Sequence, residues 1–478
     1  MNSNVRTGVK TINRRKFFQG TAGAVAATCA VPTIVPSSVL GANAPSNRIH
    51  VGFMGIGTQS YALLPAFLEH ADVQVVAVCD VNTESSGYGY RKGGGFPAGT
   101  KIGGRKPGQE RVNAYYAEKT GVGQYRGCDA YNDFREVLSR DDVDAVVLAV
   151  PDHWHSIMTV KAAEAGKDIY CEKPLSLTVA DGRQMVEAVR KHKRVLQTGS
   201  MYRSYPRCRF ACELVRNGRI GKVTRVLTSM DSGRSGPGPG WQPMPVLDGL
   251  DYNMWLGPAP EAPYHEDRCI YGFRFIRDYA GGQTTNFGAH CFGIVQWALN
   301  ADNTGPVEFE DLGTTWPEPG DLYNVPIEAN FRARYAEGIE LLCHTKELGF
   351  TQRFEGSDGW IEIGSSGLKT FPQSLATSKI GANELHLHES VAGRKLNVEG
   401  SHGIPVYEDH ARNFLDCVKS RQDPIEPVEA GHRTATMCHL ANIAMQLKRK
   451  VRWDPDTEQI LDDSEASGLL SRPVRQDW

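Results

Sequence analysis

A glycine-rich turn follows the first apolar run of the chain and precedes a helical pattern. Gly55 would allow a tight turn, Gly57 would let the backbone approach a pyrophosphate, and Ser60 is small enough for the third, packing position. The amino end of the helix would add N–H groups and the positive end of its dipole. The spacing therefore predicts a dinucleotide phosphate site, with further contacts from Thr58 and Gln59.

Asp80 strengthens this prediction. It stands at the end of the next apolar run, 20 residues past Ser60, where a carboxylate can accept hydrogen bonds from a ribose 2′-hydroxyl. The same charge would repel a 2′-phosphate, so NAD is expected in preference to NADP. The alternative interpretation is a structural turn followed by an aspartate at a strand end.

Two more polar groups follow apolar runs. The segment from Pro151 to His155 follows one run, and Glu172 and Lys173 follow the next, just before Pro174. Because ligands bind at the carboxyl ends of parallel strands, both groups are expected at the cofactor site. An ammonium held at a hydroxyl would stabilise the alkoxide that develops as hydride leaves. The alternative for Lys173 is an ordinary surface lysine ahead of a proline turn.

A glycine pair opens a third motif. Gly281 and Gly282 are followed by Asn286, His290 and Gly293. An imidazole suits proton transfer near neutral pH. An amide at position 286 can position a hydroxyl, but it cannot accept a proton or raise the pKa of a nearby histidine. The alternative for His290 is a satisfied histidine on a helix face.

In this order, the motifs resemble the family named for glucose-fructose oxidoreductase, inositol dehydrogenase and MocA. The resemblance covers about residues 48–300 and extends loosely to the end of the chain. It implies an N-terminal Rossmann domain with a doubly wound parallel sheet, then a C-terminal α/β domain with a large open, mainly antiparallel sheet. It also implies NAD(P)-dependent chemistry on a sugar or cyclitol, and a homo-oligomer.

The resemblance assigns roles to single residues. It implies that Lys173 reaches the nicotinamide ribose and the substrate hydroxyl, and that His290 is the catalytic histidine. Asn286 and Gly293 depart from the family, which usually has aspartate at both positions, so the acid–base mechanism follows less directly than the fold. Looser matches suggest substrate contacts, with a structural role as the equal alternative, at Tyr202, Arg203, Arg274 and Asp278.

The elements that would position these residues follow from the hydrophobic pattern. From residue 48, short apolar runs alternate with helical patterns, as in βαβ units. Strands are expected at 49–54, 73–79, 143–150, 168–171 and 194–197, and helices at 61–69, 157–165 and after Thr178. A glycine-rich, basic stretch at 84–111 is expected to be a loop, either a functional cover or a mobile surface insertion.

The pattern changes after residue 200. Alternating stretches at 222–230, 327–335 and 339–345 predict an antiparallel sheet. Two late helical patterns, 410–419 and 430–448, could pack on that sheet or return to the first domain. The expected domains are a signal segment at 1–44, a Rossmann domain at 48–200 and a substrate and oligomerisation domain at 201–478.

The first 44 residues contain basic but no acidic side chains. The pair Arg14 and Arg15, followed by a weakly apolar run at 20–35, resembles a twin-arginine export signal and implies a periplasmic or otherwise exported protein. A membrane anchor is the alternative, but the run is too short and too polar to span a bilayer. Cleavage after Ala42 and cleavage after Ala44 both fit.

Composition limits the remaining classes. Of 478 residues, 40% are hydrophobic and 23% charged, which excludes a disordered chain. The net charge of −2 shows no basic excess of the kind that binds nucleic acid. The 11 cysteines form no Cys-x-x-Cys pair, and the histidines form no zinc motif, so no metal is expected.

The leading hypothesis is an exported oxidoreductase that transfers hydride between a sugar or cyclitol hydroxyl and a tightly bound nicotinamide cofactor. A second is a glycosidase that uses bound NAD for transient oxidation, elimination and re-reduction. A third is a catalytically silent sugar-binding protein, which the departures at Asn286 and Gly293 suggest.

Overall fold

The computed structural model describes residues 47–86, 102–346, 351–364, 367–387 and 404–475. The expected signal segment at 1–44 and most of the expected loop at 84–111 lie outside these residues.

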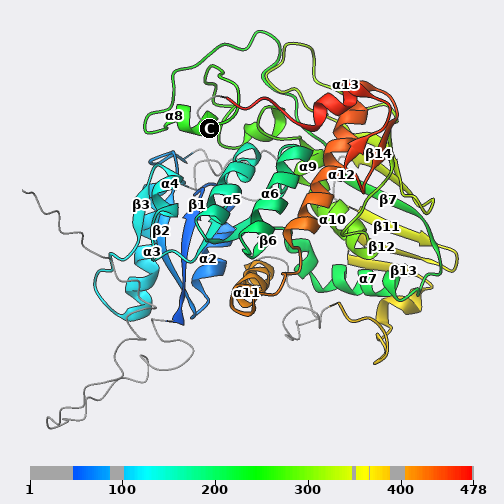
Figure 1. The fold of residues 1–478 in the computed structure, drawn as a ribbon, viewed down its shortest axis with the longest axis horizontal. Helices are drawn as coiled ribbons and strands as arrows, with labels where there is room; N and C mark the ends of the chain where they lie inside the picture. The colour runs from blue at the N-terminus through cyan, green and yellow to red at the C-terminus, as the bar shows by residue number, and fades with distance from the viewer. Residues whose placement is uncertain (1–46, 87–101, 347–350, 365–366, 388–403, 476–478) are drawn as a thin grey trace, which may run out of the picture. The chain divides into compact units, whose positions relative to one another are not determined.

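The first sheet is six-stranded and parallel, in the order β3-β2-β1-β4-β5-β6 (Figure 1). Its four longest strands are almost wholly buried, as expected when helices cover both faces of a parallel sheet. The predicted doubly wound sheet is confirmed. Its strands are β1 (Ile49–Met54), β2 (Val73–Cys79), β3 (Asp129–Tyr131), β4 (Ala145–Leu148), β5 (Asp168–Cys171) and β6 (Leu196–Thr198).

Five helices connect these strands: α2 (Ser60–Leu68), α3 (Arg105–Thr120), α4 (Phe134–Leu138), α5 (His155–Glu164) and α6 (Val179–Lys191). The expected cap of α6 is present, because the Thr178 side chain accepts a hydrogen bond from the Asp181 backbone N–H. The predicted end of the loop, residue 111, is wrong, because α3 already begins at Arg105. This helix buries only a narrow stripe, Gly108, Val112 and Tyr116, which left a weak sequence pattern.

The second sheet has nine strands in the order β13-β12-β11-β7-β10-β9-β8-β14-β15. Neighbours are antiparallel except β7 and β10, so the expected mainly antiparallel sheet is confirmed. The strands are β7 (Val223–Asp231), β8 (Glu308–Asp311), β9 (Asn330–Arg334), β10 (Glu340–Lys346), β11 (Thr351–Gly356), β12 (Trp360–Gly364), β13 (Gly367–Phe371), β14 (Val451–Asp454) and β15 (Gln459–Ile460).

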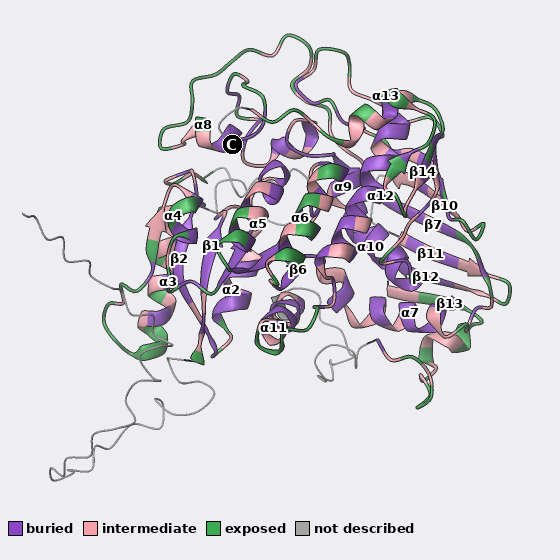
Figure 2. Ribbon diagram, in the orientation of Figure 1, coloured by how far each residue is buried: buried purple, intermediate pink, exposed green. Residues whose placement is uncertain are grey.

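Helices α7 (Pro206–Arg216), α10 (Gly288–Ala298) and α12 (Val428–Leu447) cover one face of this sheet and share a buried core with it (Figures 1 and 2). Burial alternates along β9, β11 and β12, so the opposite face is more exposed.

The two helices near the end of the chain pack against different parts of the protein. Helix α11 (Ile404–Ser420) returns to the first domain, where Phe414 packs against Phe67 of α2 with ring centroids 6.3 Å apart. Arg412 pairs with Asp72 at 2.7 Å and fixes the same contact. Helix α12 lies between the second sheet and α6. The first domain is therefore completed by a segment from the end of the chain.

Candidate active site

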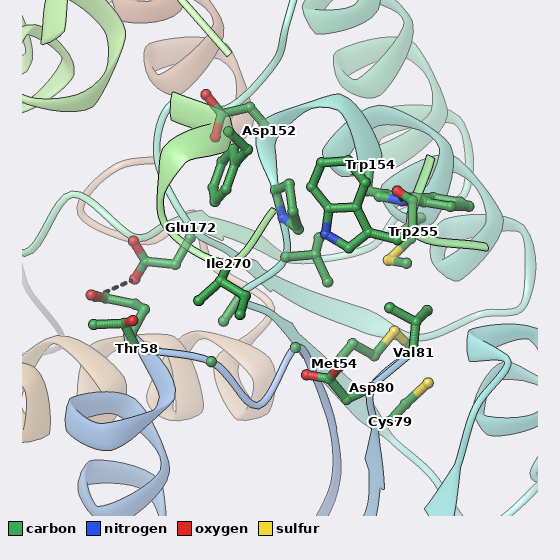
Figure 3. Close-up of a pocket in the computed structure, with 18 of the residues that line it drawn as sticks. Met54, Thr58, Cys79, Asp80, Val81, Asp152, Trp154, Glu172, Trp255 and Ile270 are labelled. Atoms are coloured by element: carbon green, nitrogen blue, oxygen red, sulfur yellow. Dashed lines mark hydrogen bonds between the residues drawn. The ribbon is translucent and has the colours of Figure 1, made fainter. Parts of the chain in front are cut away.

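A pocket lies at the carboxyl ends of β1, β2, β4 and β5, the edge where the sequence predicts a ligand (Figure 3). The strand-end turns of the first domain form one wall. The other wall comes from beyond residue 250 and includes Trp255, Ile270 and Phe273. Asn286 also lines the pocket, so the motifs of both halves of the chain meet there.

The glycine turn has the geometry that a pyrophosphate site requires. Gly55 has φ +86°, and a Cβ there would lie 2.4 Å from the Ala149 carbonyl oxygen, so no larger residue fits. Ser60, fully buried, begins α2 and donates from Oγ to the Gly57 carbonyl oxygen at 2.7 Å. Gly57, Thr58 and Gln59 line the pocket at this amino terminus. The turn thus fits the phosphates of a dinucleotide.

Asp80 follows β2 and lines the same pocket. Its carboxylate accepts hydrogen bonds from the backbone N–H groups of Ile56, at 2.7 Å, and Asn82, at 2.8 Å. Burial raises the pKa of Asp80 to about 6, and these two donors oppose the rise. The bonds fix the carboxylate beside the glycine turn, and each oxygen has a second lone pair that can accept from a ribose hydroxyl.

Two more buried carboxyl groups line the pocket, Asp152 and Glu172 (Figure 3). Burial raises the pKa of each to about 7, while the positive charges of Lys173 and Arg274 lower it. Gln59 donates from Nε2 to Glu172 at 3.1 Å. Both carboxyl groups therefore exchange protons near neutral pH, which suits general acid–base work.

Lys173 and Asn286 are brought together, as the motifs predict. The Lys173 ammonium donates to the side-chain oxygen and to the backbone oxygen of Asn286, each at 2.9 Å. The Asn286 amide nitrogen donates in turn to Gln283 at 2.9 Å, within α9 (Gln283–Asn286). Asn286 therefore positions the ammonium at the pocket.

His290 lies behind this pair, in the first turn of α10, and is not among the residues that line the pocket. Its ring stacks on Tyr202, with centroids 4.3 Å apart and planes at 18°. Nδ1 is buried and has no hydrogen-bond partner among the described residues. Burial, and then the charge of Lys173, lower the pKa of His290 well below its usual value, so the imidazole is neutral.

His155 joins two turns of the pocket wall. Its ring nitrogens lie 2.8 Å from the Pro174 carbonyl oxygen and 3.0 Å from that of Val150. The ring is buried and does not line the pocket, whereas Pro151 does. His155 thus positions the segments that carry Pro151 and Lys173. Its contact with the cofactor stays a prediction.

Arg203 is placed inside the protein, away from the pocket, so its predicted substrate contact is replaced by a structural role. Its side chain is 1% exposed and forms ion pairs with Asp302, at 2.6 Å, and Glu426, at 3.0 Å. It also donates to the Gly293 carbonyl oxygen at 3.1 Å. A Cβ at Gly293 would lie 3.7 Å from a carboxyl oxygen of Glu426, so this acid stands beside the position where the family usually has aspartate.

Of the other three residues expected to contact the substrate, one lines the pocket and two do not. Arg274 lines the pocket, with its guanidinium over the rings of Tyr271, at 4.6 Å, and Phe273, at 4.5 Å. Asp278 does not line it. Tyr202 does not line the pocket, and its ring stacks on that of His290.

Sequence reasoning missed the aromatic wall and Asp152 as site residues. Trp154 donates from its indole nitrogen to the Trp255 carbonyl oxygen at 3.1 Å, which ties the two walls together. Trp154 and Asp152 belong to the segment from Pro151 to His155, so their position after a strand could have identified them as site residues. No sequence pattern indicated that Trp255, on α8 (Tyr252–Leu256), would line the pocket.

In the described ranges, no cluster of three potential metal ligands occurs. Among the helices of those ranges, none is long and apolar enough to cross a membrane.

A Rossmann sheet, a glycine turn and a ribose-side carboxylate, joined to a second open sheet, define a two-domain dinucleotide-binding protein. Residues 105–200 match the oxidoreductase family with an NAD-binding Rossmann fold, and residues 236–363 and 397–478 match the C-terminal α/β domain of that family. The chain belongs to this family, named for glucose-fructose oxidoreductase, inositol dehydrogenase and MocA. The expected resemblance and the expected NAD cofactor are confirmed.

Curated relatives match part of the chain. A 2,7-anhydro-N-acetylneuraminate hydratase of Mediterraneibacter gnavus is 36% identical over 96 residues, which are 20% of this chain and 26% of the relative. A glycosyl hydrolase family 109 protein of a Shewanella species is 28% identical over 196 residues, 38% of this chain and 37% of the relative. The chain thus spans about a quarter to two fifths of the length of these relatives.

A solved structure matches more of the fold. The aldose-aldose oxidoreductase of Caulobacter crescentus, in complex with glycerol, aligns with a TM-score of 0.57 at 19% identity, over 85% of this chain and 99% of that one. At this identity the likeness shows the fold.

The contact between Lys173 and Asn286 yields a prediction about His290. Replacing Asn286 by aspartate adds a negative charge near the imidazole, which favours its protonated form, so the Asn286→Asp variant should raise the pKa of His290 by about one unit or more. Histidine NMR titration, assigned with a His290→Gln variant, measures this shift. Asn300→Asp, past the far end of α10, is the control and should leave it unchanged. An unchanged His290 titration in Asn286→Asp would show that the two sites are not coupled.

Proposed function

We propose that the protein is an NAD-dependent oxidoreductase that transfers hydride between a sugar or cyclitol hydroxyl and a tightly held cofactor. One observation carries the proposal: Lys173, anchored by Asn286, lines the same pocket as the glycine turn and Asp80. The fold of the aldose-aldose oxidoreductase supports the substrate class.

Each group of pocket residues has a separate proposed role in binding or catalysis. The glycine turn and the amino terminus of α2 would hold the pyrophosphate, and Asp80 the ribose hydroxyls. NAD, when bound, supplies the hydride acceptor. The Lys173 ammonium stabilises negative charge on the substrate oxygen. The hydroxyl proton can pass to Asp152 or Glu172, which line the pocket, and Arg274 orients the ring. The catalytic role of His290, which does not line the pocket, stays a prediction.

A second candidate is a redox-neutral reaction, in which the substrate is oxidised, loses a leaving group and is reduced again. Asp152 and Glu172 favour it, because carboxyl groups with a pKa near 7 in the pocket can donate and accept the protons that elimination requires. The hydratase and the glycosyl hydrolase among the relatives support this alternative. A silent sugar-binding protein is the third candidate.

The proposal is tested by purifying the full chain, identifying the nucleotide that it carries, and screening sugars and aryl glycosides. Net NADH formed in step with sugar oxidation supports the dehydrogenase. Release of the aryl group without net NADH supports the redox-neutral reaction. Sugar binding without turnover of any substrate would contradict both and leave the silent protein.

Asp80 should set the preference for NAD over NADP. The Asp80→Ala variant removes the acceptor for the ribose hydroxyls and the repulsion of a 2′-phosphate, so it should weaken NAD binding about tenfold and affect NADP far less. Calorimetric titration with both nucleotides measures this. Asp129→Ala, an exposed carboxylate paired with Arg140, is the matched control. Tighter binding of NADP than NAD by the unmutated protein would show that Asp80 is misassigned.

We also infer export by the twin-arginine route, supported by Arg14 and Arg15 ahead of a weakly apolar run. Changing both to lysine should retain the protein in the cytoplasm, because the export machinery reads the arginine pair. Fractionation of cells that express either form measures this. Equal export of the two forms would refute the proposal. The domain limits at 48–200 and 201–478, and a homo-oligomer, stay predictions.

A further inference from the structure

A second pocket lies apart from the first and shares no lining residue with it. Its walls come from the turn before α6, the segment before α9, the chain between β8 and β9, helix α12 and the segment that follows α13 (Ser464–Ser467). Its polar lining includes Arg277, Trp316, Asn442, Gln446 and Arg472.

Two guanidinium groups dominate the charge of this second pocket. Arg472 donates to the backbone oxygen of Arg277, and Arg277 donates to that of Asn324 at 3.2 Å. Within the described residues, neither side chain forms an ion pair. The negative charge of Asp278 raises the pKa of both guanidinium groups, and that of Asp181 raises the pKa of Arg472, without a direct contact. Burial lowers the pKa of Arg472 to about 10 and that of Arg277 in the same direction.

Further polar atoms of the lining lack partners. The indole nitrogen of Trp316 and the side-chain oxygen of Asn442 are buried and make no hydrogen bond to any described residue. The remaining ionisable lining residue, His439, has its pKa lowered to about 3 by burial and is neutral. Buried polar groups without partners destabilise a protein unless a ligand or water satisfies them. An anion can accept from the Trp316 N–H, whereas the Asn442 oxygen is an acceptor and needs a donor such as water.

We propose that the second pocket is a binding site for a small anion that carries a carboxylate or phosphate group. A guanidinium presents five N–H donors in a fork that matches either group, and the Trp316 N–H adds another donor. The pocket has a volume of about 80 Å³, which is enough for one such group.

The site adjoins the segment that serves the first pocket. Asn442 donates to the Gly281 carbonyl oxygen at 2.8 Å, and Gly281 in turn donates from its backbone N–H to Thr285 at 3.1 Å, one residue before Asn286. Arg277 stands three residues after Arg274, which lines the first pocket. An anion held by Arg277 and Arg472 would therefore stabilise the segment that carries Arg274 and Asn286, and the folded protein as a whole.

Calorimetric titration of the full chain tests the site, with saturating NAD present so that the glycine turn is filled. The probes are inorganic phosphate in one arm and malonate in the other, at constant ionic strength. Saturable binding of at least one probe is expected, and a preference between them identifies the group. Arg277→Gln and Arg472→Gln should each weaken it about tenfold or more, as expected for the loss of a charge-assisted hydrogen bond.

The control is Arg475→Gln, three residues along the same segment, where the guanidinium donates to the Asn253 carbonyl oxygen outside the pocket. It should leave binding within about twofold, because Arg475 does not line the pocket and charges exposed to solvent are screened. If an arginine variant fails to fold, Trp316→Phe removes the indole donor and keeps the ring, and should also weaken binding. No binding of either probe, or binding that survives these substitutions, would overturn the proposal.

Discussion

Replacing Lys173 by alanine should lower turnover at least about 10²-fold, as expected for a positioned group that stabilises charge in the transition state. The ammonium is the cation that Asn286 holds at the pocket, through two bonds of 2.9 Å. Its loss leaves the developing alkoxide without that stabilisation, so hydride transfer becomes unfavourable. Steady-state rates and the midpoint of thermal unfolding, measured on the same preparation, check the effect.

Lys161→Ala is the matched control, because this lysine is exposed on α5 and, among the residues that the structure describes, pairs only with Glu164. It should keep full activity. The Lys173→Ala variant should also keep its melting temperature, which separates a chemical role from a structural one. Near-normal turnover in Lys173→Ala would remove this residue from the mechanism.

Arg203→Ala should lower the free energy of unfolding by about 3–5 kcal/mol, the range for removing one partner of a buried ion pair. The variant leaves Glu426, which is fully buried, without its cation. Chemical denaturation measures the loss. The exposed pair Arg190–Asp423 offers a control, since Arg190→Ala should cost no more than about 1 kcal/mol.

The same variant distinguishes a structural role from the substrate contact that the sequence suggested. If Arg203 is structural, the folded fraction of Arg203→Ala keeps the KM of the unmutated protein while its stability falls. A large rise in KM at unchanged stability would contradict the internal placement of this side chain.

The first domain was readable from the sequence because its signals are local. The run Asp168–Cys171 and the turn from Gly55 to Ser60 combine apolar strands, glycine and a helix start within a few residues, and the structure places them as predicted. Helix α3 was missed because its buried stripe is narrow and its composition polar.

The second half was less readable because its pairings join distant segments. Strand β7 pairs with β10 and β11, which follow it by more than a hundred residues. No local sequence pattern predicts which distant strands pair. The structural role of Arg203 could not be predicted for the same reason, because its partners Asp302 and Glu426 lie far along the chain. Burial, which raises the pKa of Asp152 to about 7, is likewise a property of the assembled fold.

The proposed function has one central step, in which a bound nicotinamide takes hydride from a sugar hydroxyl at Lys173. The direct measurement is rapid mixing of the NAD-loaded protein with a sugar substrate, with the near-ultraviolet absorbance of reduced nicotinamide followed through a single turnover. This band should appear in the unmutated protein and should form at least about 10²-fold more slowly in Lys173→Ala. It should decay again if the reaction is redox-neutral. Conversion of the sugar with no such band at any time would contradict hydride transfer to the bound nicotinamide.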